Sequence, residues 1–246
     1  MQPTTQEMQG TLSAPIIIQG APPIPPLEPG DHLTRPEFER RYKAMPELKK
    51  AELIEGVVFM PSPVRAEQHG NPHADLITWM GLYRASTPGV RVSADASIRL
   101  DLDNEPQPDA LMYIEPARGG LARLDEEGYL VGGPELVAEV AASTVSIARN
   151  TKWRVYRRNN IREYIIWRVD DQAIDWFVLR QGQYEPLPRT ADGLLRSEQF
   201  PGLWLNPDAL PRFDLAGVLQ VLQQGLASPE HAAFVSRLQP RPEGQP

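Results

Sequence analysis

Residues 134–167 have the sequence PELVAEVAASTVSIARNTKWRVYRRNNIREYIIW. Residues 135–141 have the pattern of a strand, and from Leu136 to Ala141 both faces are apolar except at Glu139, which is typical of a central strand that is covered on both sides. Residues 145–159 then have helical spacing and end at two asparagines, which favour a left-handed helix stop. Residues 162–169 again have the pattern of a strand. The stretch therefore predicts two strands that lie parallel through a right-handed helical crossover.

The neighbouring sequence extends this unit on both sides. Its periodicity predicts strands at 90–101, 110–114 and 173–179, a hairpin at 52–60 that turns at Glu55-Gly56, and helices that begin at the caps Thr34 and Asn71. Residues 115–133 are polar and glycine-rich, and they predict an insertion with a small hairpin about Glu126-Glu-Gly128. This order of elements predicts an α/β fold in which helices flank a central mixed β-sheet.

The two ends of the chain differ in composition from its middle. Residues 1–31 are rich in proline, glutamine, threonine and glycine, and we expect a disordered N-terminal segment there. Residues 211–246 contain an amphipathic stretch and a proline-rich tail, and we expect a C-terminal helical extension. The sequence thus predicts one folded domain over residues 32–210, which suits a chain of 246 residues.

Composition and charge restrict the class of function. The chain has no cysteine, which excludes disulfides, thiolate zinc sites and cysteine nucleophiles. It shows neither a secretory signal peptide nor an apolar run of the roughly 20 residues that span a bilayer, so we expect a cytoplasmic protein without membrane contact. The net charge of −7 argues against a general nucleic-acid coat, because non-specific DNA binding depends on neutralising phosphates.

Any contact with DNA must therefore come from a local basic patch. Arginines are concentrated in the predicted helix that follows residue 145, and those that we expect to bind DNA are Arg149, Arg154, Arg157 and Arg158. The alternative interpretation of the same residues is a solvated helix face.

Three ionisable residues interrupt apolar segments. Asp109 opens the strand at 110–114, Glu139 lies within the strand at 135–141, and Lys152 falls on the apolar side of the following helix. Charges on buried faces are costly unless they are paired or bind a metal. Two carboxylates on neighbouring strands can hold Mg²⁺ with water and a phosphate, and a lysine can stabilise charge on phosphorus. The alternative is a buried Glu–Lys pair that only fixes the strand against the helix.

The same residues resemble a known nuclease pattern. Pro108-Asp109, then Glu139-Val-Ala, then Lys152 resemble the PD-(D/E)XK nuclease superfamily, in the variant where the lysine has moved from the strand to the following helix. From residue 34 to residue 205 the chain resembles the Uma family of restriction endonucleases. The segments that carry this likeness are Glu52-Leu-Ile-Glu-Gly56, Met60-Pro-Ser-Pro63 leading to His69, Gln107-Pro-Asp109, Pro134-Glu-Leu-Val-Ala-Glu-Val140 and Lys152-Trp-Arg-Val-Tyr-Arg-Arg-Asn-Asn-Ile-Arg-Glu-Tyr-Ile-Ile-Trp167.

This resemblance implies a restriction-endonuclease-like core and a DNA endonuclease that depends on Mg²⁺, with Mn²⁺ able to replace it. It implies that Asp109 and Glu139 are metal ligands, that Lys152 is the catalytic lysine, and that Glu52 and His69 lie near the site. A homodimer is the default expectation, because two-fold symmetry would let two sites reach both DNA strands.

Two features depart from the family's pattern. Ala148 stands where the family often has an acidic residue, which would weaken a second metal site. The insertion at 115–133 separates Asp109 from Glu139 more than usual, and it would either reshape the access of DNA or leave it unchanged.

Other functions stay open at this point. One is a catalytically inactive binding module built on a nuclease fold, and another is an enzyme with paired carboxylates, such as a glycoside hydrolase. The aromatic residues sit within apolar patterns rather than on a sugar platform, which disfavours the hydrolase. For His69 the alternative is a histidine at a helix start that is bonded to backbone. His69 and His73 lack a third ligand nearby, which disfavours a zinc site.

Overall fold

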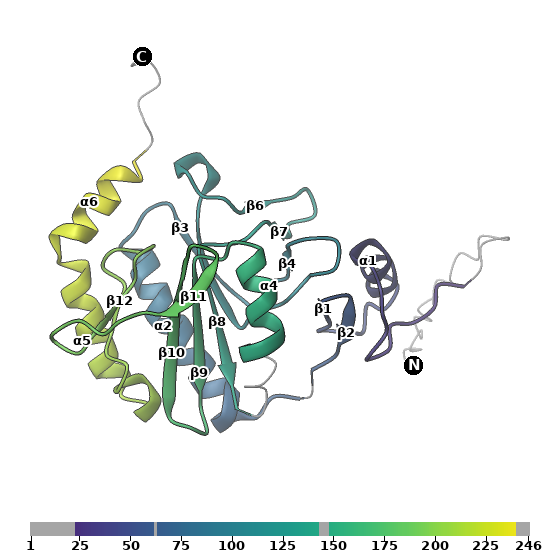
Figure 1. Ribbon diagram of the computed structural model, residues 1–246, viewed down its shortest axis with the longest axis horizontal. Coiled ribbons are helices and arrows are strands. Elements are labelled where there is room, and N and C mark those ends of the chain that lie inside the picture. The colour runs from purple at the N-terminus through teal and green to yellow at the C-terminus, as the bar shows by residue number, and fades with distance from the viewer. Residues whose placement is uncertain (1–22, 62, 143–147, 240–246) are drawn as a thin grey trace, which may run out of the picture.

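A six-stranded sheet runs through the centre of the computed structural model, which describes residues 23–61, 63–142 and 148–239, with the backbone alone at 148 and 149. The strand order is β11-β10-β9-β8-β5-β3, and β8 and β9 pair in parallel while the other neighbours are antiparallel. These strands are β3 (Val90–Ala94), β5 (Ala110–Ile114), β8 (Leu136–Ala141), β9 (Glu163–Arg168), β10 (Ala173–Arg180) and β11 (Gln183–Pro186). The predicted α/β fold with a central mixed sheet is confirmed (Figure 1).

The parallel pair β8 and β9 lies at the middle of this sheet. Every residue of β8 is buried, as expected where both faces of a strand are covered. The connection to β9 contains a π-helical turn, η3 (Ala148–Lys152), and the helix α4 (Trp153–Arg158). Residues 143–147, which include the start of the helix predicted at 145–159, lie outside the described residues. Asn160 has a φ of 57°, which is the left-handed conformation expected at the end of this helix.

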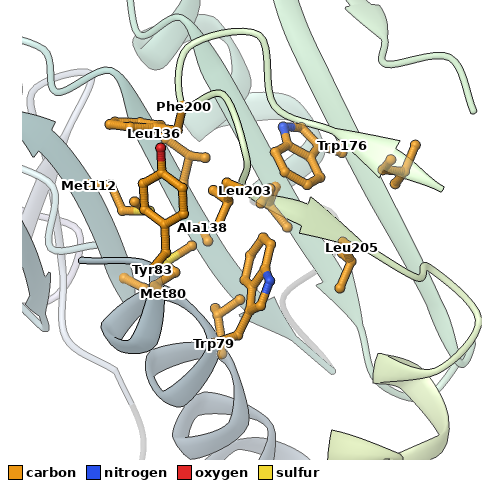
Figure 2. Close-up of a cluster of buried hydrophobic side chains, with 14 of the residues drawn as sticks. Trp79, Met80, Tyr83, Met112, Leu136, Ala138, Trp176, Phe200, Leu203 and Leu205 are labelled. Atoms are coloured by element: carbon orange, nitrogen blue, oxygen red, sulfur yellow. The ribbon is translucent and has the colours of Figure 1, made fainter. Parts of the chain in front are cut away.

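One face of the sheet is covered by α2 (Asn71–Ala85), α5 (Leu215–Leu226) and α6 (Pro229–Arg237). Trp79, Met80 and Tyr83 project from α2 towards the sheet, where they meet Met112 and Leu136 (Figure 2). All five side chains are fully buried. A short hairpin of β12 (Leu195–Arg196) and β13 (Trp204–Leu205) contributes further to this core.

The opposite face carries α4 and a small three-stranded sheet, and Figure 1 shows α2 and α4 on opposite sides of the central sheet. The small sheet has the order β4-β7-β6 and consists of β4 (Ile98–Arg99), β6 (Arg123–Leu124) and β7 (Leu130–Val131). β6 and β7 form the small hairpin that was predicted within the insertion, and a 3₁₀ turn at Pro116–Arg118 precedes them.

A third, smaller core joins the N-terminal elements. It contains α1 (Arg35–Lys43) and the antiparallel hairpin of β1 (Glu52–Ile54) and β2 (Val57–Phe59), as the sequence predicted.

Leu27 is 3% exposed in the same core, so the predicted disordered segment includes residues that pack on the domain. At the other end, α5 and α6 are the helices within the segment 211–246, and they pack on the main core. The boundaries predicted for the N-terminal segment (1–31), the folded domain (32–210) and the C-terminal extension (211–246) remain predictions. No helix among the described residues is long and apolar enough to cross a bilayer.

Two predicted elements differ from the structure. Residues 90–101 were predicted as one strand, but the chain leaves the central sheet after β3 and enters the small sheet as β4. Asp95 lies at this break with a φ of 50°, a left-handed conformation that cannot continue a strand. Asn71 was predicted to cap a helix but is its first residue, because the π-helical turn η1 (Ala66–Gly70) runs directly into α2.

Arg99 in β4 connects α1 to the insertion at residues 115–133. Its side chain is 9% exposed, and its guanidinium lies 2.5 Å from Asp125, 2.8 Å from Glu127 and 3.1 Å from Glu39. Glu105 is 2% exposed and lies 3.7 Å from the same guanidinium. Burial, reinforced by Glu39 and opposed by Arg99, raises the pKa of Glu105 from its ordinary value of 4.5 to about 7.

The raised pKa of Glu105 predicts a pH-dependent stability. The folded state binds the proton more tightly than the unfolded state, so the free energy of unfolding falls as pH rises from 4.5 to about 7. Glu105→Gln mimics the protonated acid, and we expect it to exceed the wild type in stability by about 2–3 kcal/mol near pH 8 and to match it near pH 5. Urea unfolding at the two pH values measures this difference. Glu126→Gln, on the exposed part of the insertion, is the control, and equal pH slopes for wild type and Glu105→Gln would contradict the prediction.

Candidate active site

Asp109 and Glu139 lie side by side at the centre of the sheet. The register of β5 and β8 pairs Ala110 with Ala138, and continuing it by one residue places Asp109 opposite Glu139. Paired residues point to the same face of a sheet, here the face that carries α4. The two residues are 5% and 7% exposed. Neighbouring strands thus bring together the two carboxylates that were predicted from the sequence.

Lys152 reaches the same place from the end of η3. Its Nζ lies 2.9 Å from Oε1 of Glu139 and 2.9 Å from Oε1 of Glu52, which begins β1. Tyr156, one helical turn after Lys152, donates its hydroxyl to Oε1 of Glu139 at 2.7 Å. Oε1 of Glu52 also accepts from the backbone N–H of Gln107 at 2.7 Å. We refer to Glu52, Asp109, Glu139 and Lys152 as the acidic cluster; its members come from four segments of the chain, namely β1, the start of β5, β8 and η3.

The acidic cluster contains more negative than positive charge. Burial raises the pKa of Glu139 to about 7; Lys152 opposes this rise, while Asp109 and Glu52 reinforce it. Burial alone would lower the pKa of Lys152, but Glu139 and Glu52 outweigh it and raise that pKa above its ordinary value. Lys152 is therefore a charged ammonium that compensates for part of the surrounding charge. A cation that entered beside Asp109 and Glu139 would relieve the remaining repulsion.

Asp109 also faces a more open side of the cluster. Its Oδ2 accepts from the backbone N–H of Val140 at 2.7 Å, which fixes the carboxylate against β8. Its Oδ1 lies 3.4 Å from Nε2 of His69 and 3.8 Å from Nζ of Lys50. The side chains of His69 and Lys50 are 21% and 27% exposed, so this side of Asp109 is nearer to solvent than Glu139 and Lys152 are.

The ring of His73 bonds to backbone beside this site, whereas the ring of His69 faces the carboxylate of Asp109. Nε2 of His73 lies 2.7 Å from the carbonyl oxygen of Asp109, and its Nδ1 lies 3.9 Å from Oδ2 of Asp95. The rings of His69 and His73 are 5.7 Å apart. His69 thus lies beside the predicted metal ligand Asp109.

The two carboxylates of Asp109 and Glu139 suit a hard cation that keeps part of its hydration shell. Within residues 23–61, 63–142 and 148–239 there is no group of three or more histidine, aspartate or glutamate side chains placed to hold a metal. Zinc usually takes at least three protein ligands, whereas Mg²⁺ is commonly bound by one or two carboxylates together with waters and substrate phosphates. Asp109 and Glu139 fit the second description.

The predicted basic patch is partly neutralised by acidic neighbours. Arg154 pairs with Glu55 at 2.7 Å, and Arg158 lies 3.6 Å from Glu55 and 3.4 Å from Asp101. Arg157 donates to Gln183 at 2.8 Å. The side chain of Arg149 lies outside the described residues. A role of these arginines in binding DNA remains a prediction.

Four residues of this region were not identified from the sequence: Lys50, Tyr156, Asp95 and His73. The sequence does place Tyr156 on the helix face of Lys152, four residues after it, but that position alone did not assign Tyr156 to the site. His73 was considered only as half of a zinc pair. Lys50 and Asp95 lie in connections between elements, where no periodicity relates them to Asp109.

Comparison with known proteins identifies the family. The model of the Uma2 family, described as "Putative restriction endonuclease", matches residues 35–208. A solved structure from Anabaena variabilis, described as "a putative nuclease belonging to DUF820", is similar with 14% sequence identity and a TM-score of 0.49, over 76% of this chain and 97% of that chain. No curated protein matches the chain significantly. Because the family model spans most of the chain, from α1 to beyond β13, this protein belongs to the Uma2 family of restriction-endonuclease-like proteins.

Proposed function

We propose that this protein is a divalent-cation-dependent endodeoxyribonuclease, which hydrolyses phosphodiester bonds of DNA at the acidic cluster. The observation that carries this proposal is the convergence of Asp109, Glu139 and Lys152 in one place, with each residue less than a tenth exposed. Membership of the Uma2 family supports DNA as the substrate class.

Asp109 and Glu139 would hold Mg²⁺, or Mn²⁺ in its place. Such an ion, when bound, polarises phosphoryl oxygens and lowers the pKa of bound water. The chain's own contribution is to hold the carboxylates in position before substrate arrives. The backbone N–H of Val140 orients Asp109, while Lys152 and Tyr156 both bind Oε1 of Glu139. Glu52 in turn holds the ammonium of Lys152, and His69 lies against Asp109.

Nicking of supercoiled plasmid by the purified full chain tests the proposal. With Mg²⁺ or Mn²⁺ we expect nicked and then linear DNA, and EDTA should stop the reaction. A covalently closed plasmid has no ends, so cutting it identifies an endonuclease. Protein carrying Asp109→Asn, purified in parallel, controls for a contaminating nuclease. Intact plasmid with either metal, at protein concentrations where the DNA is bound, would contradict the proposal.

A catalytically inactive DNA-binding module is the second candidate. It is favoured by the contacts of Lys152, whose ammonium bridges Glu52 and Glu139 as a structural ion pair would. In this case the wild type binds duplex DNA in a gel-shift assay but leaves plasmid intact with Mg²⁺ or Mn²⁺. The same two assays therefore separate the candidates.

A further inference from the structure

We propose that Lys50, rather than Lys152, is the lysine that contacts the phosphate of the DNA substrate, and that Lys152 is a positioning residue. This inference rests on the proposed nuclease function and names the group that receives the substrate's charge. It departs from the simple assignment of Lys152 as the lysine that acts on phosphorus.

Lys152 is poorly placed to reach a phosphate. Its side chain is 8% exposed, and its Nζ is held at 2.9 Å by each of two carboxylates, Glu52 and Glu139. Moving the ammonium towards a substrate would leave both carboxylates buried without their cation. Removing one partner of a buried charge pair is strongly unfavourable. The ion pairs therefore hold Lys152 in the interior, where it fixes Glu139.

Lys50 has the opposite surroundings. Its side chain is 27% exposed, and its nearest partner, Oδ1 of Asp95 at 3.0 Å, belongs to a side chain that is 47% exposed. Exposed ion pairs contribute little to stability, so the ammonium can exchange this partner for a phosphate at low cost. Asp95 would then be solvated rather than left buried.

The position of Lys50 is nevertheless well defined. Ala51 and Glu52, which follow it directly, are 1% and 8% exposed, so the backbone is anchored where β1 begins. Its Nζ lies 3.8 Å from Oδ1 of Asp109, on the side of that carboxylate that also faces His69. A phosphate that approached Asp109 from this side would meet the ammonium of Lys50 before that of Lys152.

Three variants of the full chain test this assignment: Lys50→Met, Lys50→Arg and Lys152→Met. Lys49→Met is the matched control, because Lys49 is the exposed neighbour of Lys50. Two quantities are measured for each variant. One is the single-turnover rate of plasmid nicking with Mg²⁺. The other is the salt dependence of binding to a labelled DNA duplex, with Ca²⁺ in place of Mg²⁺, by fluorescence anisotropy. Circular dichroism establishes that each variant is folded.

We expect Lys50→Met to lower the nicking rate about a hundredfold, as loss of one charge-stabilising donor does in other enzymes. The slope of log K against log salt should fall in magnitude by about 1, which corresponds to one phosphate contact. Lys50→Arg should restore the slope and part of the rate, and Lys49→Met should behave as the wild type. Folded Lys152→Met should lose nicking but keep the wild-type slope.

Several results would overturn the assignment. If the wild type nicks DNA and Lys50→Met equals Lys49→Met in rate and slope, the assignment is wrong while the nuclease function stands. The assignment is also wrong if Lys152→Met, rather than Lys50→Met, reduces the slope. If the wild type binds without nicking and Lys50→Met still loses one unit of slope, the phosphate contact is supported and the nuclease function fails. Absence of both binding and nicking removes both proposals.

Discussion

Replacement of Asp109 by asparagine is expected to slow Mg²⁺-dependent nicking of plasmid by about a thousandfold. A catalytic metal supplies several kcal/mol of transition-state stabilisation, and each 1.4 kcal/mol corresponds to about a factor of ten in rate. Asparagine keeps the shape of the side chain and can still accept the N–H of Val140, so the local backbone should stay in place. What it loses is the negative charge at Oδ1, on the side that faces Lys50 and His69.

The Asp109→Asn experiment needs a second readout that does not depend on cutting. Titration calorimetry with Mg²⁺ should show weaker binding to the variant than to the wild type, at equal melting temperature. Asp170→Asn, in the exposed turn after β9, is the matched control and should leave both readouts unchanged. A variant that cuts at the wild-type rate and binds Mg²⁺ as well would remove Asp109 from the site.

Replacement of Lys152 by methionine is expected to lower the free energy of unfolding by about 3–5 kcal/mol in metal-free buffer. Methionine fills a similar volume but leaves Glu52 and Glu139 without the cation that lies 2.9 Å from each. For a chain of this size the loss corresponds to a drop in melting temperature of about 10 °C. Mg²⁺ should raise the melting temperature of the variant more than that of the wild type, because a bound cation would replace part of the lost charge.

A double-mutant cycle separates charge from packing in this result. Lys152→Met combined with Glu139→Gln should be more stable than Lys152→Met alone, since one uncompensated carboxylate is removed. Lys49→Met, which loses an exposed lysine, serves as the reference and should leave stability nearly unchanged. Equal melting temperatures for Lys152→Met and the wild type would mean that the ion pairs to Lys152 contribute nothing net.

The local pattern of apolar and polar residues was sufficient to predict most of the fold. The apolar run of β8 and that of β9 specify the parallel pair, because strands covered on both faces have few polar residues. The hairpin of β1 and β2 was predicted by its turn at Glu55-Gly56, and both residues have positive φ in the structure, 51° and 76°. The break at Asp95 was not predicted. On both sides of Asp95, apolar and polar residues alternate as they do in a strand. Only the pairing of β3 and β4 with two different sheets distinguishes two short strands from one long strand.

The candidate site was predictable to a smaller extent. Asp109, Glu139 and Lys152 stand out because a charge within an apolar segment violates the local pattern. Lys50 and Asp95 violate no pattern, since charged residues are ordinary in connecting segments. The pairing of Lys152 with Glu52 was equally hidden, because the two residues lie in β1 and η3, which no pattern in the sequence relates to each other.

The sequence by itself determined the alternation of strands and helices, the central position of β8 and the three charges that interrupt apolar segments. These features follow from hydrophobic periodicity and from the cost of burying charge, both of which act over short stretches of chain. The tertiary structure alone decided which charges are partners: Lys152 lies between two buried carboxylates, while Lys50 lies beside Asp109 with a quarter of its side chain exposed. Electrostatic pairing depends on distance and solvent access in space, and those are set by how β1, β5, β8 and η3 meet.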